Sequence, residues 1–113
     1  MTEDCLFCKI ATKTIPADII FEDDKVVAFE DITPQAPVHV LIIPRVHIAT
    51  INDLNDASLA GYLLLTAKTL AVQLGVSESG YRLIMNCNED GGQTVFHIHL
   101  HILGGSRLTP GLN

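Results

Sequence analysis

Three evenly spaced histidines near the end of the chain constrain its fold more than any other feature. His97, His99 and His101 alternate with single aliphatic residues in the segment 95–103. In a β-strand this period of two places the imidazoles on one face and the aliphatic side chains on the other. Successive imidazoles would lie roughly 6–7 Å apart, whereas a helix would scatter them around its axis. The pattern therefore predicts a strand over 95–103 that carries a row of imidazoles.

The polar segment before this strand bears on the use of the row. Residues 86–94 contain two glycines among amide and carboxylate side chains, and a loop of this kind can hold an anion with its backbone amides. A plain half-exposed strand also alternates polar and apolar residues, but three histidines in phase are unusual. Two functional interpretations remain, a metal site and an imidazole site for phosphate chemistry, and the loop favours the second.

Composition and charge limit the class of protein. The 113 residues are 48% hydrophobic and 18% charged, which is typical of one globular domain, here spanning 1–113. No apolar run is long enough to span a membrane, and the N-terminus lacks the pattern of a signal peptide, so we expect a cytoplasmic protein without a membrane partner. The net charge of −6, without a basic cluster, argues against a nucleic-acid polymer as partner.

The remaining patterns predict an α+β fold. About five mostly antiparallel strands are expected, over 19–22, 26–30, 38–44, 82–86 and 95–103. A short N-terminal helix should follow the Cys5-x-x-Cys8 pair and end at Ile15-Pro16, and residues 106–113 form an irregular tail. One long helix should begin at Asn55 or Asp56 and run through Leu74, with Gly75 as its stop. Its apolar stripe can serve the core and a second subunit, and comprises Leu59, Leu63, Leu64, Ala67, Leu70, Ala71 and Leu74.

All five histidines fall on predicted strands or at their ends. His39 would join the row if its strand neighbours the histidine strand, with His47 beyond the far end of the same strand. Imidazoles titrate near neutrality and can act as nucleophile, base or acid. Three on one face can perform phosphate chemistry without a metal, and His99, in the centre, is the natural nucleophile.

The motif His97-Ile98-His99-Leu100-His101-Ile102-Leu103 resembles the signature of the histidine triad family of nucleotide hydrolases and transferases. The similarity to its branch of histidine triad nucleotide-binding proteins extends along nearly the whole chain. It includes Ile15-Pro16-Ala17, Ile20-Phe21-Glu22-Asp23-Asp24, Asp31-Ile32, Pro34-Gln35-Ala36-Pro37, Ile43-Pro44, His47-Ile48, Asp90-Gly91-Gly92-Gln93 and Leu103-Gly104-Gly105.

This resemblance implies a homodimeric hydrolase or nucleotidyl transferase that binds purine nucleotides. It would cleave adenosine or guanosine phosphoramidates at the α-phosphorus through a nucleotidyl-histidine intermediate on His99. The carbonyl of His97 would hold the Nδ1–H of His99, and His101 would bind phosphate oxygens. His39 would complete the network, and Thr94 would lie near the leaving group. A regulatory or scaffold protein with vestigial catalysis, and a metal-dependent hydrolase, are the alternatives; the second lacks the expected carboxylates.

The resemblance also implies a nucleotide pocket. Its residues would be Phe7, Phe29, Asp31, Ile32, Asn86, Gly92, Gln93, Thr94, Val95, His99 and His101. Phe7, Phe29 and Ile32 would wall the base, and Gly92, Gln93 and Val95 would line the phosphate. Asp31 would take the ribose hydroxyls, although from the residues alone it is equally a loop-capping carboxylate.

Two features depart from parts of this branch. Cys5 and Cys8, generally absent from animal members, could form a structural zinc site with His47 and His97, as in some bacterial members; a pair of reduced surface thiols is the alternative. No cofactor is expected for catalysis. The tail from Ser106 lacks the tryptophan of the eukaryotic branch, which leaves the leaving-group preference open.

Overall fold

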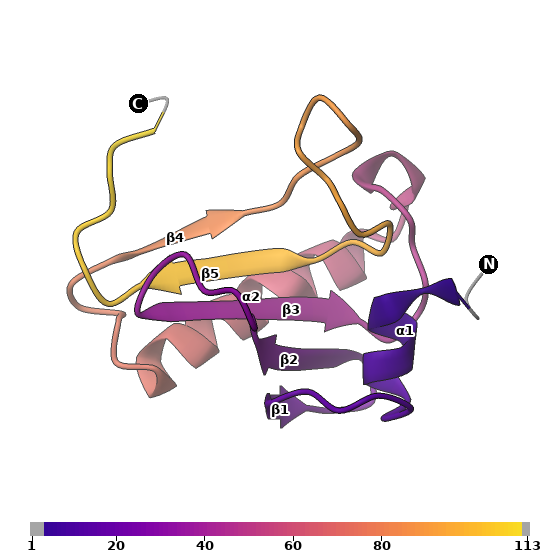
Figure 1. Ribbon diagram of the computed structural model, residues 1–113, viewed down its shortest axis with the longest axis horizontal. Coiled ribbons are helices and arrows are strands. Elements are labelled where there is room, and N and C mark those ends of the chain that lie inside the picture. The colour runs from indigo at the N-terminus through magenta and orange to yellow at the C-terminus, as the bar shows by residue number, and fades with distance from the viewer. Residues whose placement is uncertain (1–3, 112–113) are drawn as a thin grey trace.

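The computed structural model describes residues 4–111 and contains one five-stranded antiparallel sheet (Figure 1). The strands lie in the order β1-β2-β3-β5-β4. Their bounds are β1 Ile19–Glu22, β2 Val26–Glu30, β3 Val38–Pro44, β4 Tyr81–Ile84 and β5 Leu100–Gly104. The long helix α2 (Ala57–Gln73) covers one face, and the short helix α1 (Leu6–Ala11) packs against the other. This architecture confirms the predicted α+β fold.

The central strands are buried on both faces because their alternate residues enter two separate apolar clusters. Val40 and Ile42 of β3 pack with the α2 side chains, together with Ile98, Leu100 and Ile102. Leu41 and Ile43 instead pack with Phe7, Ile10 and Ala11 of the α1 segment. The histidines of β3 and β5 therefore lie on the α1 side of the sheet.

The long helix follows its sequence signals closely. Asp56 is its N-cap, and the Asp56 side chain accepts a hydrogen bond from the backbone N–H of Leu59. Gly75, with a φ of 77°, follows the C-cap residue Leu74, as expected for a glycine that ends a helix. Leu63 and Leu70 of the predicted stripe are buried. Leu64 of the same stripe is 54% exposed, so it lies outside the core of this chain.

Three predicted boundaries differ from the structure. Helix α1 ends at Ala11, before Pro16, because Thr12 caps it and Lys13 takes a left-handed φ of 63°. Strand β5 begins at Leu100, because the backbone N–H of Ile98 donates to the carbonyl of Ile48 and not to a strand. Strand β4 covers 81–84, so 85–86 lie outside it. The tail is irregular through 111, and Leu112 and Asn113 lie outside the described residues.

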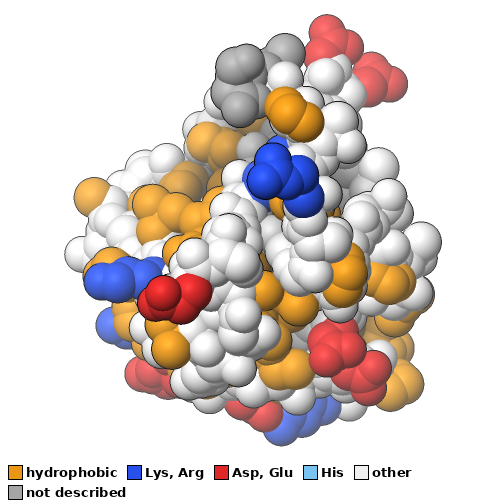
Figure 2. Space-filling model, turned by 90° about the vertical axis from the view of Figure 1, so that its left-hand side faces the viewer, with side chains coloured by type: hydrophobic (Ala, Val, Ile, Leu, Met, Phe, Trp, Pro, Cys, Tyr) orange, Lys and Arg blue, Asp and Glu red, His pale blue; other side chains and the backbone are white. Residues whose placement is uncertain are grey.

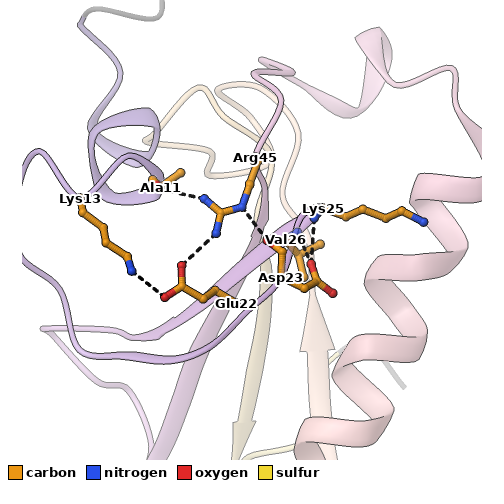
Figure 3. Close-up of polar contacts among 7 residues, drawn as sticks. All are labelled: Ala11, Lys13, Glu22, Asp23, Lys25, Val26 and Arg45. Atoms are coloured by element: carbon orange, nitrogen blue, oxygen red, sulfur yellow. Dashed lines mark hydrogen bonds and ion pairs between the residues drawn. The ribbon is translucent and has the colours of Figure 1, made fainter.

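Arg45, just after β3, fixes the helix α1 segment to the sheet (Figure 3). Its Nη1 donates to the carbonyl of Ala11 at 2.9 Å and its Nε to that of Asp23 at 2.6 Å. Its Nη2 pairs with Glu22 at 2.9 Å, and Lys13 pairs with the same carboxylate at 2.8 Å. These bonds hold the end of α1 beside the turn between β1 and β2, and so position the cysteine pair.

One face of the surface carries charged side chains of both signs (Figure 2). Figure 2 shows Lys and Arg side chains scattered among acidic and hydrophobic ones on the face that it draws. Within residues 4–111, no helix combines the length and apolar character that crossing a membrane requires.

Candidate active site

The pairing of β3 with β5 brings two distant histidines together. Leu41 pairs with His101 and His39 with Leu103, so both imidazoles project from the same face. The His39 Nε2 and His101 Nδ1 atoms are 2.9 Å apart. The ring centroids of His99 and His101 are 5.0 Å apart. The predicted adjacency of His39 and the histidine row is confirmed.

Backbone carbonyls set the orientation of the first two triad imidazoles. The carbonyl of Pro44 can only accept a hydrogen bond, so His97 donates to it from Nε2, at 2.7 Å. The carbonyl of His97 in turn accepts from Nδ1–H of His99, at 2.8 Å. Neutral His99 therefore carries its proton on Nδ1 and has a free lone pair on Nε2, the arrangement that an attacking imidazole requires.

The free Nε2 atoms of His99 and His101 face open space. Neither atom makes a hydrogen bond to any residue between 4 and 111. In the same part of the chain, every buried side-chain nitrogen or oxygen has a partner. The two Nε2 atoms are therefore reachable from solvent, although His99 as a whole is only 6% exposed.

The triad imidazoles are neutral at physiological pH. Burial lowers the pKa of His97 and of His99 below the ordinary histidine value. Burial, together with the neighbouring rings of His99 and His39, lowers the pKa of His101 to about 4. Neutral rings do not repel one another, which explains how three imidazoles can share one face.

Asp31, just after β2, caps its loop and also faces His39. Its Oδ1 accepts the backbone N–H of Thr33 at 2.8 Å, as a loop-capping carboxylate does. Its Oδ2 lies 3.5 Å from His39 Nε2. The other ring nitrogen of His39, Nδ1, accepts the backbone N–H of Gln35 at 3.0 Å.

The three residues expected to wall a base differ in their exposure. Phe7 and Phe29 are buried, with ring centroids 5.4 Å apart. The Phe7 ring also lies edge-on to that of His99, at 5.0 Å. Ile32, in the loop after β2, is 92% exposed. Phe7 thus packs between Phe29 and the ring of His99, whereas Ile32 is almost fully exposed to solvent.

The glycine loop before the triad is held by Gln93, whose groups are already engaged. Its Oε1 accepts from the N–H of Asn88 at 2.8 Å, and its Nε2 donates to the carbonyls of Ala49 at 2.7 Å and Val95 at 3.1 Å. Its own backbone N–H donates to the carbonyl of Asn88. The side chain of Gln93 therefore shapes the loop and is not free to meet a phosphate.

Other predicted loop residues lie around this structure. Asn86 donates to the carbonyl of Gly91. Gly92 has a φ of 85°, which favours glycine. Thr94 is exposed, and Val95 packs against the α1-side apolar cluster.

Four cysteine and histidine residues from three separate segments form a second group. The Sγ of Cys5 lies 3.3 Å from Nδ1 of His97, and the Sγ of Cys8 lies 3.4 Å from the same atom. The Sγ of Cys8 is also 3.3 Å from Nδ1 of His47. All four donor atoms lie within 4.8 Å of one another, which confirms the predicted meeting of these residues.

The donor set suits a tetrahedral metal ion. Sulfur and nitrogen ligands of one tetrahedral zinc ion are separated by roughly 3.5 Å, close to the distances found. His97 donates a hydrogen bond from Nε2–H to the Pro44 carbonyl, so its Nδ1 lone pair is free to face both sulfurs. Burial and the neighbouring Cys5 raise the pKa of the Cys8 thiol to about 11, so a cation must displace its proton.

Only one of the two cavities described here is lined by predicted site residues. An open pocket of about 420 Å³ is lined by Cys5, His47, Thr94 and their neighbours. A larger cavity, of about 680 Å³, lies between the turn after α2 and residues 105–108, and includes none of the predicted site residues.

Sequence analysis missed the backbone groups of Pro44 and Gln35. Every residue carries a carbonyl, and every residue except proline carries an amide N–H, so residue type does not show which of these groups bond to a histidine.

Comparisons with known proteins agree with this geometry. Residues 12–108 match the model of the HIT domain family. The chain is 50% identical over 112 residues to purine nucleoside phosphoramidase of Escherichia coli (strain K12), covering 97% of this chain and 94% of that protein.

Solved structures give the same result. A HIT family hydrolase from Legionella pneumophila superposes with a TM-score of 0.92 at 58% identity, covering 94% of this chain and 96% of the other. A histidine triad protein from Clostridium difficile gives 0.93 at 40% identity, covering 96% of each. The predicted resemblance and the prediction of a hydrolase-type enzyme are confirmed.

Proposed function

The chain belongs to the HIT domain family, and from this premise we propose that residues 1–113 form a single-domain purine nucleoside phosphoramidase. The observation that carries the proposal is the 2.8 Å bond from His99 Nδ1–H to the His97 carbonyl. It leaves His99 Nε2 unprotonated and open to solvent. A buried, neutral imidazole held in this tautomer is prepared for attack on phosphorus.

The first half of the reaction forms a covalent intermediate. His99 Nε2 attacks the α-phosphorus, the phosphorus–nitrogen bond breaks, and the departing amine takes up a proton that solvent supplies. His101, through its Nε2 side, stabilises the charge on the phosphate oxygens. The hydroxyl of exposed Thr94 is proposed to lie near the leaving amine.

The second half releases the nucleotide. A water oxygen bonds to phosphorus, the bond to His99 Nε2 breaks, and the water proton passes to solvent or to a nearby base. The Asp31 Oδ2 atom and the exposed Ile32 are proposed to meet the ribose and base. The Asn86–Val95 loop is proposed to contact the phosphate through Gly92 and its neighbours.

Turnover of adenosine 5′-phosphoramidate by metal-stripped protein tests the proposal. We expect release of AMP and, after rapid quenching at alkaline pH, a peptide containing His99 with one added adenylyl group. Tight AMP binding without turnover would instead support the alternative of a regulatory nucleotide-binding protein. Turnover that appears only when metal is restored to folded protein would support a metal-dependent hydrolase.

We propose further that Cys5, Cys8, His47 and His97 bind one structural zinc ion. Thiolates and imidazoles are zinc ligands, and four protein ligands leave no open position for a reacting water. When bound, the ion would supply a rigid cross-link between α1, the end of β3 and the triad. Catalysis would remain with His99 and its neighbours.

We also propose that the protein is a homodimer that uses α2. Leu64, Leu65 and Val72 on this helix are 54%, 61% and 64% exposed. Covering three large apolar side chains on one helix favours association. Light scattering at micromolar concentration should give twice the mass of the chain, and Leu65→Glu should lower it. A monomer at that concentration would contradict the proposal.

A further inference from the structure

We propose that the backbone N–H of Gln35 is a positioning group, which, through His39, fixes the Nε2–H form of His101. The inference rests on the proposed function for its catalytic consequence, but its structural content stands separately. It assigns a role to a loop that the triad motif does not contain.

The direction of the hydrogen-bond chain follows from its first member. A backbone amide can only donate, so His39 Nδ1, 3.0 Å from Gln35 N, must accept. Neutral His39 then carries its proton on Nε2. That atom lies 2.9 Å from Nδ1 of His101, which must accept in turn. Neutral His101 is left with its proton on Nε2.

Asp31 independently favours the same tautomer of His39, with the proton on Nε2. Its Oδ2 lies 3.5 Å from His39 Nε2, and a carboxylate favours a proton on the nitrogen that faces it. The His39 side chain is 3% exposed, so solvent does not offer replacement partners. A proton on His39 Nδ1 would point at the Gln35 N–H and leave Nε2 without a proton for His101.

The surrounding loop is suited to hold the amide in place. Gln35 lies between Pro34 and Pro37, whose rings restrict the backbone. The Gln35 side chain is exposed and donates to the carbonyl of Thr33 at 3.2 Å. The backbone and the side chain of this residue therefore do different work, which allows them to be separated by substitution.

The consequence for catalysis lies at the solvent-reachable Nε2 of His101. An Nε2–H there can donate to a phosphate oxygen, whereas the opposite tautomer would present a lone pair to a negatively charged oxygen. His99 and His101 thus offer opposite faces to one phosphate: a lone pair for attack and a proton for stabilisation. Backbone groups, the His97 carbonyl and the Gln35 amide, set the two tautomers separately.

The experiment uses ring-¹⁵N-histidine protein and long-range proton–nitrogen NMR, which distinguishes the two neutral tautomers directly. In the parent protein, His39 and His101 should carry Nε2–H, and His99 should carry Nδ1–H. Gln35→Pro removes the amide proton, and Gln35→Ala keeps it as the matched control. We expect Gln35→Ala to retain both tautomers and Gln35→Pro to give mixed tautomers at His39 and His101.

Kinetics provide the second measurement. With adenosine 5′-phosphoramidate, kcat of Gln35→Pro should fall about tenfold below that of Gln35→Ala, the loss expected for one hydrogen bond, with KM changed less. If proline disturbs the loop, a backbone ester at position 35 removes the same N–H without the ring. It should reproduce the mixed tautomers and the lower kcat.

The outcomes are separable. Nδ1–H on His101 in the parent protein, or unchanged tautomers and kcat in both amide-free variants, would overturn the inference. The expected tautomers in a parent protein that hydrolyses no phosphoramidate would support the hydrogen-bond chain and overturn the proposed function instead.

Discussion

Two histidine clusters in this protein satisfy the same distance criterion for a metal site but have opposite proton arrangements. In the Cys5–Cys8–His47–His97 group, the Pro44 carbonyl accepts a hydrogen bond from Nε2–H of His97, so the lone pair on Nδ1 points at the sulfurs. In the Asp31–His39–His101 group, the Gln35 amide donates to Nδ1 of His39, so His39 carries its proton on Nε2, which faces Asp31 and His101. The first group is prepared for a cation, and the second is prepared to pass a hydrogen bond.

The difference lies in the backbone partner of the ring nitrogen that points away from each cluster, Nε2 of His97 and Nδ1 of His39. Metal-binding histidines in proteins generally donate their other N–H to a carbonyl or carboxylate. His97 follows this rule, and His39 reverses it by accepting from an amide. A cation in the second cluster would force a proton onto His39 Nδ1, against the Gln35 N–H. Clustering of donors is therefore insufficient evidence of a metal site without the outer hydrogen bonds.

The two clusters meet at one stretch of backbone. The His97 ring belongs to the first cluster, and its carbonyl holds Nδ1–H of His99, whose ring lies beside His101 of the second. The predictions below separate the work of the two clusters, beginning with the group that lies between them.

Replacing His99 should have the largest effect. His99→Ala removes the attacking nitrogen, so we expect phosphoramidate turnover to fall by at least about 10³-fold. Affinity for AMP, measured by calorimetry, should change by less than about tenfold, because His99 acts mainly in bond formation. Ser77→Ala, at an exposed position outside both clusters and the proposed pocket, is the control for general damage. Near-parent turnover in His99→Ala would contradict its assignment as the nucleophile.

The second-largest expected effect is a difference in zinc binding between variants of the two clusters. Protein purified without chelator should hold about one zinc per chain, and His47→Ala should weaken binding by roughly 100-fold or more. His39→Ala, a matched histidine replacement in the other cluster, should retain the full amount. Competition with a chromogenic chelator measures both. Loss of zinc in His39→Ala with retention in His47→Ala would reverse the comparison.

Thermal stability should follow zinc and not the hydrogen-bond chain. Cys8→Ser replaces a thiolate ligand, and we expect Tm to fall by roughly 5–10 °C, equivalent to one or two kcal/mol in a domain of this size. The kcat of the folded fraction should stay within about threefold of the parent, because the ion is not in the reaction. Equal Tm values with and without chelator would show that the cysteine pair does not stabilise this fold through a metal.

The sequence predicted the sides of the sheet better than the ends of its strands. The period of two around His99 correctly separates the imidazoles from Ile98, Leu100 and Ile102, because the side on which a residue lies depends only on the local extended backbone. The start of β5 at Leu100 was not predictable, because residues before it bond to Ile48 and Pro44, which are distant in sequence.

In the candidate site, the residues could be predicted but their hydrogen-bond directions could not. The four members of the Cys/His group were named from the resemblance to bacterial members with such a zinc site, and the structure brings all four together. The proton arrangement was not accessible, because it depends on a carbonyl of Pro44 and an amide of Gln35, groups that every such residue carries. Gln93 shows the converse: its side chain suits a phosphate, but tertiary hydrogen bonds already engage it.

The smallest expected effect is a pH dependence that belongs to the second cluster. His101 has an ordinary pKa of 6.5 and a folded pKa of about 4, because of burial and the neighbouring rings. Between these values the unfolded chain binds more protons than the folded chain, so folding stability rises with pH. The contribution is complete above pH 6.5 and is lost as the pH falls through about 4. Urea unfolding of the zinc-free protein at pH 7, 5.5 and 4.5 should show this loss, and His101→Phe should make it shallower. The same pH slope in His101→Phe and the parent would mean that other groups carry the acid sensitivity and that His101 titrates normally in the folded protein.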